Sequence, residues 1–347
     1  MLRPYTIAST IGVDEVRAAA YAAGIDLVGF TTPRAVDRHL PVIQRLNVTA
    51  AELQTVIVLA KRINLGVIGA DDSVERQYAS GRLAGEATRG ARDLAYFLEA
   101  QGHLAVVVSS SLLDFRAEAG GSLDLCPAGQ GSSMLRCAAV AAGLGTLGLN
   151  EMLLTPEFGP RIFLAGVLTD LQLEPGQPLP AELCLGLEEC GRCAAICPED
   201  AIPRRAKRGA PLSEYRGLDA RACARSSQPH GPEAFIDHLG EIIAAPSALE
   251  RRTLIESRTT AQLWQAMSYL RQGVFTACQA CVQVCPVGAD YERLQRSPRR
   301  QAELPGGVQR RIEDGFVLVD LTPQPPSLKG SWQNLTPQPP SLKRRGS

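Results

Sequence analysis

The first half of the chain alternates between apolar patterns typical of helices and apolar patterns typical of strands. Apolar residues recur at helical spacing over residues 13–23, with Asp14 near the start and Gly24 directly after the end, which predicts an amphipathic helix. Similar reasoning predicts helices over residues 82–101 and 134–142, and strands over residues 25–30, 55–59, 104–109 and 161–169. Because the two types alternate as far as about residue 175, this half predicts a layered α/β or α+β domain.

The second half has a different composition. Residues 175–180 (PGQPLP) break the pattern like a hinge, and eight of the ten cysteines follow, between Cys184 and Cys285. We therefore expect an α+β domain over residues 1–180 and a cysteine-rich domain over residues 181–300. Residues 301–321 would form a return segment, in which residues 317–321 predict one last strand that returns to the core.

The end of the chain repeats itself. LTPQPPSLK occurs at residues 321–329 and again at residues 335–343. A proline-rich repeat donates few backbone hydrogen bonds and buries little surface, so residues 322–347 predict a disordered tail without a role. A recognition peptide is the alternative interpretation.

Charge and composition narrow the function classes. The 347 residues include 36 Lys and Arg and 36 Asp and Glu, and this balance argues against a chain that binds nucleic acid over its whole surface. A local basic run at Arg204, Arg205, Lys207 and Arg208 is interpreted as a solvated charge cluster, with nucleic-acid contact as the alternative. The sequence shows no secretory signal and no run of 18 apolar residues, so we expect a cytoplasmic protein without a membrane span.

The cysteines form two motifs of one spacing. Cys190, Cys193 and Cys197 follow C-x2-C-x3-C before a proline, and the pattern recurs over residues 278–286. This is the spacing of bacterial ferredoxins, in which the cysteine before proline binds the other cluster. The ligands should therefore be crossed. One predicted [4Fe-4S] cluster takes Cys184, Cys190, Cys193 and Cys285, and the other takes Cys197, Cys223, Cys278 and Cys281.

Cys184 is displaced, because it stands six positions before Cys190 instead of three. The extra residues span at most about 10 Å and Gly186 favours a turn, so we predict a complete site with a bulged loop. A three-cysteine site with an open iron or a three-iron cluster is one alternative, and zinc is another. The proline after each third cysteine and the lack of a nearby histidine favour iron–sulfur over zinc. Cys126 and Cys137 lie outside the array and are predicted to be ordinary thiols.

A glycine-rich loop precedes the cysteines. AAGLGTLGLN contains Gly143, Gly145 and Gly148, which formally match G-x-G-x-x-G. The loop follows an alanine-rich helical stretch instead of a strand, so it is a poor dinucleotide fingerprint. A tight turn that needs positive φ is the simpler interpretation.

Residues 138–175 (AAVAAGLGTLGLNEMLLTPEFGPRIFLAGVLTDLQLEP) resemble the central segment of the epoxyqueuosine reductase and reductive dehalogenase superfamily. In that superfamily an A-G-L-G-x-x-G-x-N loop and an L-x-x-x-P-E-[YF]-G segment precede a strand and then a double [4Fe-4S] module. Residues 184–286 match this module in order and spacing, so the resemblance covers roughly residues 10–300.

The resemblance implies a nitroreductase-like α/β sandwich followed by a ferredoxin-like double-cluster domain. It also implies a corrinoid (cobalamin), bound base-off between the two, with Gly143, Gly145, Gly148 and Asn150 beside it. One cluster would lie near the corrinoid and the other near the surface. Electrons would then pass from an external low-potential donor of the ferredoxin or flavodoxin type to cobalt.

The chain departs from the superfamily pattern at several positions. Where epoxyqueuosine reductases carry a V-D-S-A-P-type segment with a proton-donating aspartate, this chain has VVVSSSLLD, and Asp114 is out of place. Leu149 stands at the basic position of the glycine loop, SSMLRCAA replaces a His-containing segment, and no twin-arginine signal is present. No catalytic acid is therefore assigned. The candidate proton donors are Tyr78, Tyr96 and Asp114. Residues of these types are more often packed side chains or surface side chains than proton donors.

Three functions fit these observations. The first is a reductase that passes single electrons through two clusters to a corrinoid or another centre in the first domain. The second is a non-catalytic, ferredoxin-like electron-transfer protein, and the third is a tRNA-acting, epoxyqueuosine reductase-like enzyme that uses the basic run. The large first domain favours the reductase, because a carrier needs only the cysteine module.

Overall fold

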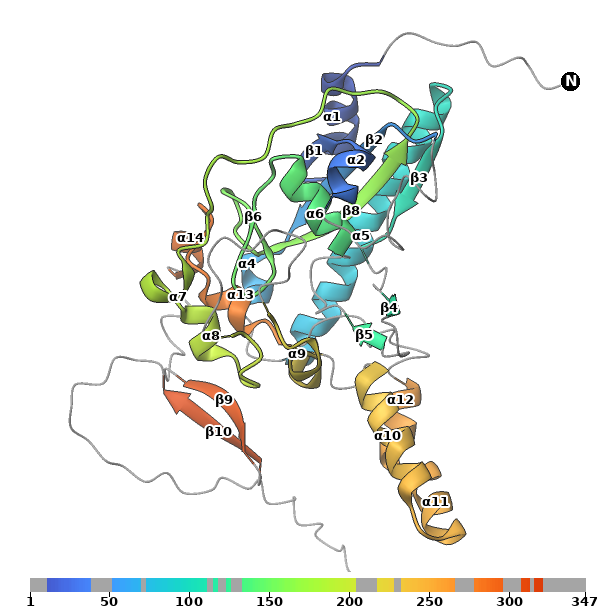
Figure 1. Ribbon diagram of the computed structural model, residues 1–347, viewed down its shortest axis with the longest axis vertical. Helices are drawn as coiled ribbons and strands as arrows, with labels where there is room; N and C mark the ends of the chain where they lie inside the picture. The colour runs from blue at the N-terminus through green and yellow to red at the C-terminus, as the bar shows by residue number, and fades with distance from the viewer. Residues whose placement is uncertain are drawn as a thin grey trace, which may run out of the picture.

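An antiparallel four-stranded sheet with strand order β1-β2-β8-β3 forms the centre of the first half (Figure 1). The computed structural model describes residues 11–38, 52–69, 73–110, 115–117, 123–125, 133–203, 217–227, 232–265, 278–295, 307–312 and 315–320. The sheet consists of β1 (Leu27–Thr31), β2 (Thr55–Arg62), β3 (Ala105–Val108) and β8 (Ile162–Thr169). The two middle strands, β2 and β8, are almost entirely buried, which explains why their sequences are continuous apolar runs.

Helices cover both faces of this sheet (Figure 1). Successive residues of β2 point to opposite faces: Ile57 joins the core with α1 and α5, whereas Val58 joins the core with α6. The covering helices are α1 (Val13–Ala22) and α5 (Ser73–Ala100) on one face, and α2 (Pro33–Asp37) and α6 (Ser133–Ala141) on the other. The mixed α/β character predicted for this half is therefore confirmed.

The predicted elements of the first half are all present, with small shifts of their ends. The largest difference is α5, which begins at Ser73 instead of residue 82. Short elements complete this part. They are the helix α4 (Leu65–Ile68) and two strand pairs, β4 (Phe115–Ala117) with β5 (Leu123–Leu125) and β6 (Thr146–Leu147) with β7 (Leu153–Leu154).

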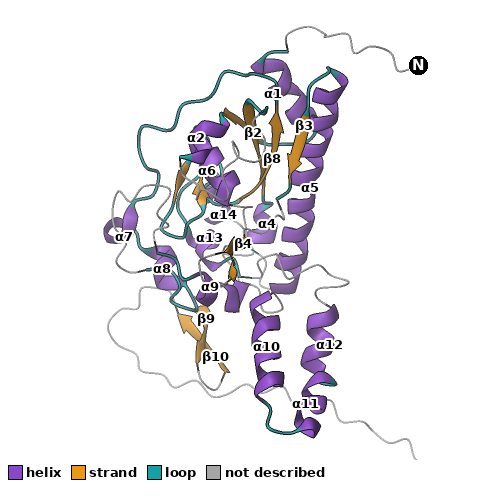
Figure 2. Cartoon of the chain, turned by 45° about the vertical axis from the view of Figure 1, so that its right-hand side comes forward, coloured by secondary structure: helices purple, strands orange, loops and turns teal. Residues whose placement is uncertain are grey.

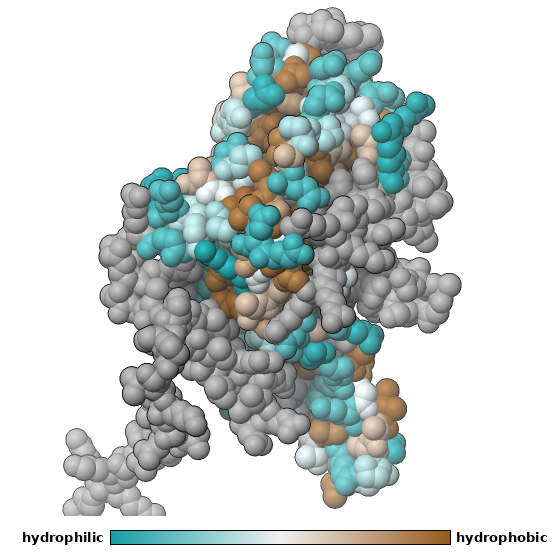
Figure 3. Space-filling model, turned by 60° about the vertical axis from the view of Figure 1, so that its left-hand side comes forward, coloured by the Kyte–Doolittle hydropathy of each residue, from teal (hydrophilic) through white to brown (hydrophobic). Residues whose placement is uncertain are grey.

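The cysteine-rich part is built from short helices. These are α7 (Gly186–Glu189), α8 (Arg192–Ile196), α9 (Ala220–Ser227), α13 (Ala280–Val284) and α14 (Tyr291–Gln295). A helical arm of α10 (Pro232–Ala244), α11 (Ala248–Ile255) and α12 (Arg258–Gln265) projects from the body (Figure 2). Hydrophobic residues lie on the surface of this arm (Figure 3), among them Ile243, Leu249 and Trp264.

The predicted last strand is β10 (Gly315–Asp320), which pairs with β9 (Gly307–Ile312) in a sheet separate from the central one. Among the described strands, β10 therefore does not join the core sheet, contrary to the prediction. In the described part of the chain, none of the helices combines the length and the apolar character needed to cross a bilayer. Asp114, Cys126, the basic run over residues 204–208 and the repeat tail over residues 322–347 lie outside the described residues.

Candidate metal centres

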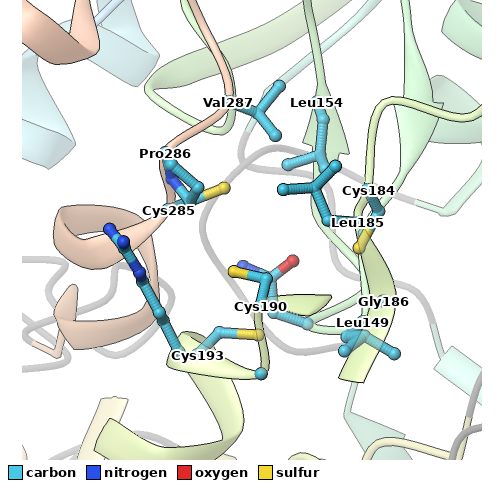
Figure 4. Close-up of a pocket in the computed structure, with 14 residues that line it drawn as sticks. Leu149, Leu154, Cys184, Leu185, Gly186, Cys190, Cys193, Cys285, Pro286 and Val287 are labelled. Carbon is cyan, nitrogen blue, oxygen red and sulfur yellow. The ribbon is translucent and has the colours of Figure 1, made fainter. Parts of the chain in front are cut away.

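Eight cysteines line two neighbouring pockets, four in each. The first pocket is lined by Cys184, Cys190, Cys193 and Cys285, and the second by Cys197, Cys223, Cys278 and Cys281. Figure 4 shows the sulfur atoms of the first pocket around a common open space. Each pocket thus combines cysteines of both motifs in the crossed arrangement that the spacing predicts.

The thiols surround a volume instead of a point. Among the described residues, no three His, Cys, Asp or Glu side chains converge closely enough to hold a single metal ion. The space between the protein atoms is about 370 Å³ in the first pocket and about 500 Å³ in the second, including the parts open to solvent. Four thiols around such a volume fit the donor set of a [4Fe-4S] cluster, and the ligand assignment stays a prediction.

Two short helices of similar design produce the crossing. α8 carries Cys193, and α13 carries Cys281; the two helices pack against each other. Each helix ends at a cysteine with extended backbone, Cys197 with ψ 118° and Cys285 with ψ 118°. A proline follows each of them, and proline excludes helical conformation from the residue before it. The chain therefore leaves each helix at its third cysteine and delivers that thiol to the other pocket.

The displaced cysteine reaches the first pocket through a bulge. Gly186, two residues after Cys184, adopts a φ of +77°, and residues 186–189 form the short helix α7. A second left-handed glycine, Gly191, donates its backbone N–H to the Gly186 carbonyl at 3.1 Å and begins α8. The extra residues are thus coiled into one helical turn, and Cys184 lines the pocket together with Cys190.

Burial and mutual repulsion favour the protonated thiols of the first pocket. Burial, together with the neighbouring thiolates of Cys184, Cys285 and Cys190, raises the pKa of Cys193 to about 12. Burial likewise raises the pKa of Cys285 to about 11, although the backbone N–H of Val287 and the charge of Arg161 oppose the rise. Thiolates are the metal-binding form, so binding of a cationic group here must release protons.

Two thiols of the second pocket have pKa values that are shifted in the same direction. Burial raises the pKa of Cys278 and of Cys281. Polar groups already face the sulfur atoms: the Ala201 N–H donates to Cys197 Sγ at 3.3 Å, and the Cys223 thiol donates to Ser227 Oγ at 3.8 Å. A donor to sulfur, such as the Ala201 N–H, is the kind of hydrogen bond that tunes the potential of an iron–sulfur cluster.

The glycine loop packs against the chain itself. Gly143 has a φ of +78°, and a Cβ there would lie 2.1 Å from the Gln177 carbonyl oxygen. A Cβ at Gly145 would lie 2.0 Å from the Leu154 carbonyl oxygen. These two glycines are therefore required by backbone packing within the protein, whereas contact with a corrinoid stays a prediction for them and for Gly148 and Asn150.

The same loop holds the cysteine segments in place. The Leu183 N–H, one residue before Cys184, donates to Thr146 Oγ1 at 3.0 Å. The Leu218 N–H donates to Glu151 Oε1 at 3.2 Å. Glu151 is buried and has a φ of +57° although it is not glycine. Such a conformation costs about 1–3 kcal/mol, so the surrounding contacts must hold it.

A second contact between the halves was not found from the sequence. The backbone N–H groups of Ala289 and Asp290 donate to the carbonyls of Pro156 and Glu157 at 2.9 and 3.2 Å. Arg161, fully buried, donates to the carbonyls of Cys285 at 3.0 Å and Val287 at 2.6 Å. Residues 155–160 (TPEFGP) therefore bind the loop that follows Cys285.

The other candidates lie apart from the pockets. Tyr78 and Tyr96 are 59% and 63% exposed on α5, which fits the surface interpretation of these tyrosines. Cys137 is buried in the core against the central sheet. Neither tyrosine nor Cys137 lines either cysteine pocket.

Comparison with known proteins gives matches in the predicted superfamily, although no family model matches the chain. A tetrachloroethene reductive dehalogenase of Desulfitobacterium hafniense is 32% identical over 111 residues, which are 32% of this chain and 19% of that protein. An epoxyqueuosine reductase of Gloeobacter violaceus is 37% identical over 105 residues, which are 29% of this chain and 28% of that protein. The matched segments thus span less than a third of these curated relatives. The homologues of this chain are reductive dehalogenases and epoxyqueuosine reductases, which confirms the resemblance.

Structural comparison gives partial alignments with solved structures of the same two groups. A catabolic reductive dehalogenase aligns with a TM-score of 0.47 and 16% identity, over 85% of this chain and 36% of that one. An epoxyqueuosine reductase aligns with a TM-score of 0.43 and 19% identity, over 79% of this chain and 64% of that one.

Proposed function

We propose that the chain is an iron–sulfur oxidoreductase that passes single electrons through two [4Fe-4S] clusters to a redox centre in the first domain. The observation that carries this proposal is the pair of pockets, each lined by four cysteines from both motifs. When bound, such clusters supply one-electron transfer at low potential.

The residues of the chain have three tasks in this proposal. The eight thiols hold the clusters, and the buried apolar residues Leu149 and Ile202 between the cysteine segments exclude water. The pockets are close neighbours: the pKa of Cys281 is raised by burial, by Cys278 and Cys223 of its own pocket, and also by Cys193 of the first pocket. A short separation of the two sites favours transfer of an electron between them.

The homologues support reduction as the reaction class. The matched relatives are named for reduction of tetrachloroethene and of epoxyqueuosine. For this chain we propose a small reducible molecule as substrate, a corrinoid as the centre in the first domain, and an external donor of the ferredoxin or flavodoxin type. Epoxyqueuosine chemistry, with a tRNA substrate, is the second candidate, because epoxyqueuosine reductases are among the homologues.

Anaerobic purification with iron and sulfide analysis tests the proposal. We expect about eight iron atoms per chain, as two four-iron clusters require, and an EPR signal after reduction. Two zinc ions per chain in place of iron would overturn the redox function. Reconstitution with cobalamin then separates the candidates: a bound corrinoid spectrum supports a reductase, and clusters without corrinoid binding support an electron carrier.

A further inference from the structure

Asn150 is shared by the two cysteine pockets. It lies at the end of the glycine loop of the first domain, and of the described residues that line either pocket, it alone lines both. Only 3% of it is exposed. A polar side chain from the first domain therefore forms part of the wall between the two candidate cluster sites.

The orientation of the Asn150 amide is fixed by its oxygen. Asn150 Oδ1 accepts a hydrogen bond from the Met152 N–H at 3.3 Å; because that partner is a donor, the oxygen must face it. A Cβ at Gly148 would lie 2.7 Å from the same oxygen, so glycine at this position leaves room for the amide. The Nδ2 atom is consequently turned to the other side.

The Nδ2 atom is a buried donor without a protein acceptor. Within the described part of the chain it makes no hydrogen bond of ordinary geometry. A buried donor left unsatisfied is destabilising, so this atom indicates an acceptor that becomes available when the pocket is filled. The Cys281 sulfur is the candidate acceptor, because Cys281 lines the second pocket with Asn150 and packs against the apolar clusters that contain Leu149 and Met152.

We propose that Asn150 Nδ2 donates a hydrogen bond to the Cys281 sulfur when that sulfur holds a cluster, and thereby raises the reduction potential of the second-pocket cluster. The inference rests on the proposed function, because it needs a cluster in the pocket. Reduction adds negative charge to a cluster, and a donor at a ligand sulfur stabilises the reduced state. Asn150 is thus a tuning and positioning residue, and it acts through Cys281.

Potentiometric EPR titration of Asn150→Leu and Asn150→Asp tests this. The leucine variant removes the donor without adding charge, and the aspartate variant keeps an oxygen to accept the Met152 N–H. Loss of the donor should destabilise the reduced state relative to the oxidised state. At a fixed potential, the reduced-to-oxidised ratio of one cluster should therefore fall about tenfold, which is about 59 mV for one electron. Leu164→Met, a volume-conserving change at a buried residue of β8 that lines neither pocket, should leave both midpoints in place.

The outcomes separate this inference from the proposed function. Wild-type protein without about eight irons would defeat the proposed function, whereas eight irons with unchanged midpoints in both Asn150 variants would overturn the inference alone. If both variants lose iron, native protein with ¹⁵N-labelled asparagine amides supplies the test. Pulsed EPR of the reduced protein should then detect an asparagine nitrogen coupled to a cluster, and the absence of such a coupling would overturn the proposal.

Discussion

The Arg161 guanidinium forms a bidentate ion pair with the Asp290 carboxylate, its Nε lying 3.0 Å from each oxygen. Arg161 is fully buried, and Asp290 lies 129 positions away in the sequence, five residues after Cys285. The remaining guanidinium nitrogens donate to the carbonyls of Cys285 and Val287. One side chain at the first position before β8 therefore ties the central sheet to the segment that supplies the crossed cysteine.

Substitution of Arg161 by Gln should lower both stability and iron content. The change leaves the Asp290 charge in a mostly buried site without its partner, and breaking a buried ion pair costs about 3–5 kcal/mol. Because Cys285 loses its support, we expect iron to be lost first from the first pocket. Urea unfolding and iron analysis of the same preparation measure the two effects.

Arg252→Gln is the matched control. Arg252 pairs with Glu256 at 2.9 Å on the surface of α11, where both side chains are largely exposed, and such a pair contributes about 0.5 kcal/mol or less. If the two arginine variants unfolded at the same urea concentration, the docking role of Arg161 would be wrong.

Gly143→Ala should destabilise the first domain. Its φ of +78° is strained for alanine, and the new Cβ would lie 2.1 Å from a backbone oxygen that no side-chain rotation can move. We expect a loss of about 2 kcal/mol or more. Thermal or urea unfolding measures it.

Gly85→Ala tests the same substitution where neither constraint exists. Gly85 lies within α5, and a Cβ there would meet nothing within 4 Å. Alanine in a helix interior is favoured over glycine by about 0.5–1 kcal/mol, so this variant should be more stable than the wild type. A stabilised Gly143→Ala variant would contradict the packing of the glycine loop.

The central sheet could be predicted because its middle strands are buried on both sides. β2 and β8 appear in the sequence as unbroken apolar runs, and such runs need no knowledge of distant partners. The early start of α5 at Ser73 could not be predicted, because the residues that precede position 82 are mostly polar and lack apolar periodicity. Tertiary context decides helix ends of this kind.

The cysteine array could be predicted equally well, because ligand spacing is a local property of the sequence. Each motif fixes its own three cysteines, and the proline after the third predicts the crossing. Arg161 and Asp290 have no such signal: their pairing depends on how two distant segments dock. An arginine at the start of an otherwise apolar strand was the one available hint, since a buried arginine needs a partner. The role of Gly145 in packing was hidden for the same reason, because its neighbour is the backbone of β7.

Cys184 should be a ligand in spite of its displaced position. We expect Cys184→Ala to lower the iron content from about eight to about seven or fewer atoms per chain, because an iron that has lost its thiolate is readily released. Conversion of one cluster to a three-iron form would appear as a changed EPR spectrum of the oxidised protein.

Cys137→Ala controls for the loss of any thiol. Cys137 is buried in the core of the first domain and lines neither pocket. Its substitution should cost some stability through lost packing and leave the iron content unchanged. A Cys184→Ala variant with unchanged iron and an unchanged spectrum would instead support a first pocket completed by three cysteines.

The metal-free folded chain should resist alkylation at Cys193 and Cys285. Only the thiolate reacts, and burial beside other thiols raises the pKa of Cys193 to about 12 and of Cys285 to about 11. Their alkylation rates should therefore rise about tenfold per pH unit from pH 7 to about 11 or 12. In urea-unfolded chain the rates should level off above about pH 8.5. Peptide mass spectrometry after timed alkylation measures both sites at once.

The same shifts fix the sign of the pH effect on stability. Protons are held more tightly in the folded chain, so these thiols contribute stability fully below about pH 8.5 and lose that contribution as the pH rises through the folded-state pKa values. The urea midpoint of metal-free protein should accordingly fall above pH 9. Cluster-loaded protein should not show this fall, because its thiolates are already paired with metal. Identical pH profiles of the alkylation rate for folded and unfolded chain would mean that the thiols do not share a buried pocket before the clusters bind.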